Sequence, residues 1–172
     1  MSDTPLAGNE ARATVYVAVA PHDAFRIFTE EIDLWWRHGV RFRNAGAKRG
    51  LIRIEPGVNG RVFESFEGIN REPVVIEIGR VTLWQPPERL LIEWRNANFA
   101  STEKTEVDVT FRASAKGCEV RVAHRGWAAI RPDHPVRHGG DAQQTLRTIG
   151  TWWGELLSSL REFAATPGPS SH

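Results

Sequence analysis

The feature that most constrains this chain is a long amphipathic segment near its C-terminus, residues 141–165. Asp141 is placed to cap the start of a helix, and Pro167 follows the end, where a helix cannot continue. At about 1.5 Å per residue such a helix is roughly 35 Å long and spans a small domain. Its apolar residues recur at steps of three and four, which predicts one wide apolar face: Leu146, Ile149, Trp153, Leu156, Leu157, Leu160 and Phe163.

The sequence before this helix begins with a strand and two short helices. Residues 13–19 alternate, with Val15 and Val17 on one face, which predicts a strand. Pro21 then opens a helix, since proline is tolerated in a first turn. A second short helical piece covers residues 30–36, and a loop rich in arginine, glycine and asparagine follows it.

Six further strands are predicted before the long helix. The pattern from residue 104 to 125 alternates cleanly between apolar and polar side chains, which is typical of an antiparallel sheet with one face in water. Gly79 is a candidate bulge at which the inward face switches. The order predicts an α+β fold in which a curved seven-stranded sheet wraps around the last helix. The six ranges are residues 51–55, 61–66, 74–84, 89–95, 104–112 and 118–125.

Length, charge and cysteine content exclude several classes of protein. A chain of 172 residues with a net charge of +1 predicts one soluble domain with no nucleic-acid or anionic-membrane partner. No apolar run approaches the roughly 20 residues of a membrane helix. The single Cys118 excludes an internal disulfide and a cysteine zinc site, which fits a reducing cytoplasm. We expect flexible tails at residues 1–10 and 166–172 around one domain, residues 11–165.

Several short motifs along residues 11–165 resemble one known family. They are Phe25-x-x-Phe28 with Trp35-Trp36, Glu55-Pro56-x-Val58-x-Gly60-Arg61-x-x-Glu64, Pro86-Pro87-Glu88-Arg89-Leu90, Thr105-x-Val107-x-Val109-x-Phe111 and His124-Arg125-Gly126-Trp127. The chain resembles the bacterial homologues of the heat-shock-90 ATPase activator, within the START and birch-pollen-allergen-like (SRPBCC) superfamily. The resemblance implies a helix-grip fold with seven antiparallel strands, two short helices after the first strand and a long C-terminal helix.

The resemblance implies a ligand-binding function more than a catalytic one. Members of the superfamily bind small hydrophobic molecules between the sheet and the long helix, and a minority catalyse reactions there. We therefore expect binding of a small hydrophobic or amphipathic ligand. The alternatives are a hydrolase-type or cyclase-type enzyme, and an interaction module with a chaperone partner. An exposed edge strand also allows a homodimer.

The expected ligand site combines apolar walls with a few polar groups. His124 shares the inward parity of Val120 and Val122, so it is either a weak candidate for a general base or a core histidine that is hydrogen-bonded within the protein. Glu64 is the other weak candidate for catalysis, and it needs a partner if it points inward, such as Arg53, His124 or a ligand. Parity does not decide whether Phe63 or Phe66 faces the core. The expected lining is Phe28, Trp36, Phe63, Glu64, Phe66, Trp94, Val109, Phe111, His124, Trp127, Trp153 and Leu157.

No metal site or cofactor is predicted. His134 and His138 have a spacing that can bind a metal on a helix, but Pro132 and Pro135 prevent a regular helix there. Basic side chains gather in a loop and are expected to be solvated, with the option of meeting an acidic ligand at a cavity mouth: Arg37, Arg41, Arg43, Lys48 and Arg49.

Overall fold

The computed structural model describes residues 10–46, 48–95, 103–127 and 142–166. Every strand and helix that the sequence predicted is present, although the first strand begins at Glu10 and ends at Val17, earlier than expected. In chain order the elements are β1 (Glu10–Val17), α1 (Pro21–Glu30), α2 (Ile32–Trp35), β2 (Gly50–Ile54), β3 (Arg61–Glu67), the 3-10 turn η1 (Ile69–Arg71), β4 (Pro73–Gln85), β5 (Arg89–Trp94), β6 (Thr105–Ser114), β7 (Gly117–Arg125) and α3 (Ala142–Ala165).

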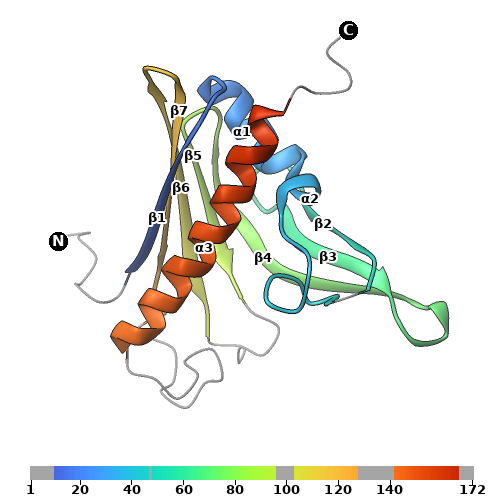
Figure 1. Ribbon diagram of the computed structural model, residues 1–172. Coiled ribbons are helices and arrows are strands. Elements are labelled where there is room, and N and C mark those ends of the chain that lie inside the picture. Colours follow the sequence, from blue (N-terminus) through green and yellow to red (C-terminus); the bar gives the residue numbers. More distant parts are fainter. Residues whose placement is uncertain (1–9, 47, 96–102, 128–141, 167–172) are drawn as a thin grey trace, which may run out of the picture.

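The seven strands form one antiparallel sheet in the order β1-β7-β6-β5-β4-β3-β2. Figure 1 shows α3 running diagonally across one face of this sheet, with α1 and α2 beside its C-terminal end and the β3–β4 hairpin extending away from the helices. The predicted α+β helix-grip architecture is confirmed. The predicted cap at Asp141 lies outside the described residues. Within the part of the chain that is described, no helix has the length and apolar character needed to cross a membrane.

The core lies between α3 and the inner face of the sheet. Cys118, Val120 and Val122 of β7 are fully buried, as their alternation predicted. Trp153 and Leu157 of α3 are each 1% exposed and face them across the interior. A helix with a wide apolar stripe and a sheet with one apolar face each need the other to bury that surface, so this pairing stabilises the fold.

The predicted bulge on β4 is confirmed. Val62 of β3 pairs with Gly79, but the next residue, Phe63, pairs with Glu77, so Ile78 is the extra residue. A side chain at position 79 would place its Cβ only 2.3 Å from the carbonyl oxygen of Glu93, which requires glycine. The bulge lets both Ile78 and Gly79 lie on the buried side, and the inward face therefore switches there.

An ion-pair network on the outer face joins four strands. Arg125 of β7 donates to Glu106 at 2.8 Å, to Glu10 at 3.1 Å and also to Asp108. Arg89 of β5 donates to both oxygens of Asp108, at 3.0 and 2.8 Å. Burial would raise the pKa of Asp108, but the hydrogen bonds from the two arginines outweigh it, and the pKa lies below its ordinary value. The network ties the outer sides of β1, β7, β6 and β5 together.

Candidate functional site

Nine of the residues predicted to line a ligand site lie together in the interior. The ring centroid of Trp36 lies 6.0 Å from that of Trp94 and 5.6 Å from that of Trp153, so these side chains contact one another. Phe28 contacts Phe111 edge to face at 5.7 Å. Whether a ligand inserts among them stays a prediction. The nine, each at most 5% exposed, are Phe28, Trp36, Trp94, Val109, Phe111, His124, Trp127, Trp153 and Leu157.

His124 is the polar centre of this aromatic interior. The indole nitrogen of Trp153 donates to its Nδ1 at 3.0 Å, and since an indole N–H is only a donor, the ring proton of His124 is on Nε2. The Nε2–H group of His124 therefore donates to the Thr105 hydroxyl oxygen, which lies 2.6 Å from Nε2. The Thr105 hydroxyl in turn donates to the carbonyl oxygen of Trp94 at 3.2 Å. Both ring nitrogens are thus occupied.

Burial keeps His124 neutral. Removal from water lowers the pKa of its imidazole from 6.5 to about 3. Because both ring nitrogens are hydrogen-bonded within the protein, His124 matches the interpretation as a core histidine whose polar atoms are satisfied. Its two hydrogen bonds connect β7 to α3 and to β6.

Glu64 points inward, as one parity of β3 predicted, and is 2% exposed. Its partners are neither Arg53 nor His124 but the loop between α2 and β2, residues 36–49. One carboxylate oxygen accepts from the backbone N–H and the side-chain amide of Asn44, at 2.8 and 2.7 Å. The other accepts from the backbone N–H of Ala45 at 3.1 Å. Glu64 therefore anchors the α2–β2 loop to the sheet, and no hydrogen bond joins it to His124 within the described residues.

Replacing Glu64 with glutamine is expected to lower the free energy of unfolding by about 1 to 2 kcal/mol. The glutamine amide presents NH₂ where one carboxylate oxygen now accepts, so a donor of Asn44 or Ala45 loses its partner. Urea denaturation measures the change. The matched control is Glu67→Gln at the exposed end of the same strand, which should stay within about 0.5 kcal/mol. Equal effects of the two substitutions would contradict the anchoring role.

Arg43 corrects the expectation that the basic loop is solvated. Arg43 is only 4% exposed. Its guanidinium donates to the Asp33 carboxylate at 2.8 Å and to the backbone oxygens of Trp36, Asp33 and Arg37 at 2.7, 3.0 and 3.2 Å. Asp33 also accepts from the backbone N–H of Ile52 at 2.9 Å, which satisfies a donor on the edge strand β2. The sequence does not predict this ion pair, because Asp33 and Arg43 are ten residues apart across a loop, and such a spacing has no regular structural meaning.

Two further arginines of the loop bind α3. Arg37 donates to the backbone oxygen of Glu155 at 2.9 Å, and Arg41 pairs with the Glu155 carboxylate at 3.1 Å. Trp152 donates from its indole nitrogen to the carbonyl oxygen of Arg41 at 2.7 Å, and it stacks on Phe42. The α2–β2 loop is therefore fastened on two sides, to β3 by Glu64 and to α3 by these contacts.

The structure separates the two phenylalanines that parity left open. Val62 and Glu64 of β3 are buried, so Phe66 has the same inward parity, whereas Phe63 has the opposite one. Phe63 lies under the guanidinium of Arg61, 4.6 Å from its ring centroid, on the outer face.

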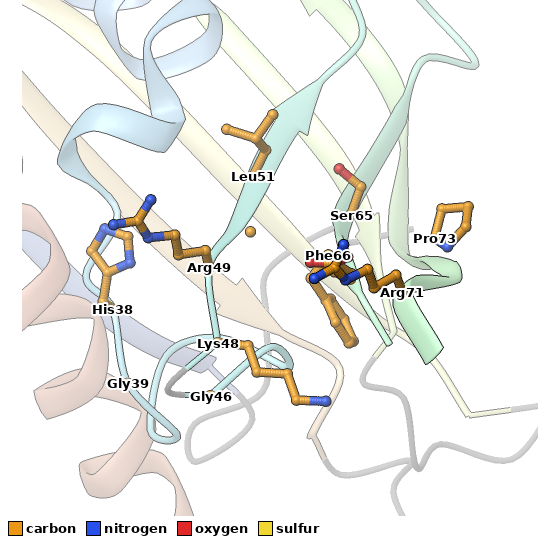
Figure 2. Close-up of a pocket in the computed structure, with 12 residues that line it drawn as sticks. His38, Gly39, Gly46, Lys48, Arg49, Leu51, Ser65, Phe66, Arg71 and Pro73 are labelled. Atoms are coloured by element: carbon orange, nitrogen blue, oxygen red, sulfur yellow. The ribbon is translucent and has the colours of Figure 1, made fainter. Parts of the chain in front are cut away.

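Phe66 forms part of an open groove of about 810 Å³ at the start of β2. One wall is the end of the α2–β2 loop with Lys48 and Arg49, and the other is the β3–β4 hairpin with Arg71. Leu51, Phe66 and Pro73 supply apolar surface (Figure 2). A Cβ at Gly50 would lie 2.8 Å from the Ser65 carbonyl oxygen, so glycine lets the loop enter the sheet this closely. Sequence reasoning named Lys48, Arg49 and Phe66 separately but did not bring them together.

No metal site is found within the described residues, where no group of three or more histidine, cysteine or carboxylate side chains lies close enough to hold an ion. His134 and His138 lie outside the described residues.

Comparisons with solved structures show a shared fold. A protein from Nitrosomonas europaea has a TM-score of 0.62 at 14% identity, and the match covers 94% of this chain and 97% of that one. A protein of unknown function from Staphylococcus aureus has a TM-score of 0.63 at 12% identity, covering 90% and 92%. The Aha1 dimer from Colwellia psychrerythraea, solved in solution, has a TM-score of 0.58 at 15% identity, covering 89% and 93%.

Comparison with protein families identifies the family of this chain as well as its fold. No protein of curated function matches the chain. Residues 18–163 match the family described as "Activator of Hsp90 ATPase homolog 1-like protein". The match begins directly after β1 and runs into the last turn of α3, so it includes the aromatic interior, the anchored loop and the groove. This chain therefore belongs to the Activator of Hsp90 ATPase homolog 1-like family, as its motifs indicated.

Proposed function

We propose that this protein binds a small amphipathic molecule, and that the groove at the start of β2 is where it binds. The observation that carries the proposal is the groove itself. It is large enough for a small ligand, its lining includes the apolar side chains of Leu51, Phe66 and Pro73, and charged side chains border it.

The way the α2–β2 loop is held supports this site. Glu64 and Arg43 fix the loop with hydrogen bonds from buried or nearly buried atoms, and both use the loop backbone as partner. A wall that is fixed before the ligand arrives loses little conformational freedom on binding, and this favours affinity. The segment just after these anchors, Lys48 to Gly50, forms the groove wall.

The geometry favours binding over catalysis. The two weak catalytic candidates have partners within the protein. His124 is hydrogen-bonded to Trp153 and Thr105, and the Glu64 carboxylate accepts hydrogen bonds from the α2–β2 loop. A general base needs a free acceptor within reach of a substrate proton. Neither side chain lines the groove.

Three further interpretations stay predictions. A ligand between the sheet and α3, in contact with Trp153 and His124, needs the packed aromatic side chains to move apart. A homodimer is supported by the Colwellia relative, which is a dimer. A chaperone partner is suggested by the family description alone.

The proposal is tested with a matched pair of phenylalanines on one strand. Phe66→Ala removes apolar surface from the groove, whereas Phe63→Ala removes a ring of the same size from the opposite face. Native mass spectrometry of freshly purified protein first shows whether an amphiphile co-purifies. Titration with decanol and decanoate, followed by isothermal calorimetry, then gives the affinity of each variant.

Phe66→Ala is expected to weaken binding of both probes by about tenfold, and Phe63→Ala by less than about twofold. The reason is that a ligand in the groove covers only the first of these rings. Equal losses in the two variants would contradict the groove as the site. So would binding that spares Phe66→Ala and instead shifts the indole resonance of Trp153, because it places the ligand between the sheet and α3.

A further inference from the structure

We infer that the groove contains an anion subsite formed by Lys48 and Arg71, so that its ligand is an amphiphile with one anionic group, a carboxylate or a phosphate. The inference rests on the proposed function and adds the chemical class of the ligand. Nothing in the family match assigns these two residues a role.

The two cations come from opposite walls. Lys48 belongs to the α2–β2 loop and Arg71 to the turn η1 between β3 and β4. Figure 2 shows the Lys48 side chain extending from its wall toward the hairpin, and the Arg71 side chain extending from the hairpin back toward the α2–β2 loop. An anionic group between them meets an ammonium on one side and a guanidinium fork on the other, while its apolar chain lies on Phe66.

The charge at the groove is unbalanced. Lys48, Arg49 and Arg71 border it, against one carboxylate, Glu67. Within the described residues none of these three cations has an ion-pair partner, whereas Arg61 binds Glu55 at 3.0 Å. A second hollow, of about 600 Å³, differs in its charge balance. Its Arg89 is paired with Asp108, and the rest of its lining holds one arginine, Arg112, and one carboxylate, Glu88. Unpaired cations beside apolar surface favour an amphiphilic anion.

The backbone at Arg71 adds a second observation. Asn70 and Arg71 have φ values of 60° and 63°, in the left-handed region that costs an ordinary residue about 1 kcal/mol or more. Arginine has no conformational reason to occupy such a position, where glycine is the favoured residue. The strained turn directs this side chain over the groove, and strain of this kind is more common at functional sites than elsewhere.

The test compares four probes on four proteins. Decanoate, decyl phosphate, decanol and inorganic phosphate are titrated by calorimetry into the full chain and into Lys48→Gln, Arg71→Gly and Arg53→Gln. Arg53 is the matched control, since it is an exposed arginine on β2 that does not line the groove. Arg71→Gly also removes the backbone strain, so its unfolding midpoint is expected to equal or exceed that of the parent.

Decanoate or decyl phosphate is expected to bind about tenfold more tightly than decanol, and this advantage should shrink at high salt. Lys48→Gln and Arg71→Gly should abolish it, and Arg53→Gln should retain it. Equal affinity for decanol and the anions overturns the subsite while the proposed function stands. Inorganic phosphate binding as tightly as decyl phosphate overturns the amphiphile as ligand. Absence of binding by any probe overturns both proposals.

Discussion

Replacing Arg43 with methionine is expected to lower the free energy of unfolding by about 3 kcal/mol. The substitution keeps much of the buried side-chain volume but removes every donor of the guanidinium. The Asp33 carboxylate then loses its ion-pair partner, and the backbone oxygens of Trp36 and Arg37 lose hydrogen bonds. Loss of one member of a buried ion pair costs about 3 to 5 kcal/mol, and the lower end applies because Asp33 is 27% exposed.

The matched control for this prediction is Arg49→Met. Arg49 lies in the same loop, is exposed and has no ion-pair partner within the described residues. The same substitution there should change the free energy of unfolding by no more than about 0.5 kcal/mol. Urea denaturation of both variants, with equal slopes against denaturant, separates the two cases. A loss below about 1 kcal/mol for Arg43→Met would show that the buried guanidinium is dispensable for stability.

Acid is expected to destabilise the protein through His124. The unfolded imidazole titrates near 6.5, whereas burial lowers its pKa to about 3 in the folded state. Between these values the unfolded chain binds more protons than the folded one, so stability falls as the pH falls and is fully present only above about 6.5. From pH 7 to pH 5, His124 alone should remove about 2 kcal/mol from the free energy of unfolding.

His124→Gln isolates this effect. Glutamine does not titrate, yet it offers an acceptor to Trp153 and a donor to Thr105. The variant is expected to be less stable than the parent at pH 7 and to show a flatter pH dependence from 7 to 5, measured by urea denaturation at each pH. Asp108 does not affect the comparison. Its pKa is lowered in the folded state, so the stability that it contributes is lost only when the pH falls below the ordinary carboxylate range. Parallel curves for the two proteins would contradict the assignment of this pH dependence to His124.

These stability tests bear on the function as well. Arg43 and Glu64 both fix the α2–β2 loop, and the end of that loop forms the groove wall that carries Lys48. A variant that loosens the loop is therefore expected to weaken binding even though the substituted residue does not line the groove. For that reason the binding experiments above use Phe66, Lys48 and Arg71. Within the described residues no hydrogen bond or ion pair joins them to Arg43 or Glu64.

The architecture of this protein follows from patterns that can be read along its sequence. Apolar steps of three and four defined α3, alternation defined β6 and β7, and Gly79 marked the bulge, because each pattern reports which side of a local element is removed from water. Family motifs agreed with that order. Parity also placed His124 inside correctly, but it left Glu64 open between the core and the outer face.

The partners of the inward-facing polar groups depend on how the elements pack together. Glu64 is hydrogen-bonded to Asn44, twenty residues away, and Arg43 is buried against Asp33. Hydrogen bonds with Trp153 and Thr105 determine which ring nitrogen of His124 carries the proton. Periodicity describes one element at a time, whereas a hydrogen-bond partner is set by how separate elements pack. The groove is of the same kind, since Lys48 and Arg71 face one opening only after the loop and the hairpin have been placed on either side of β2.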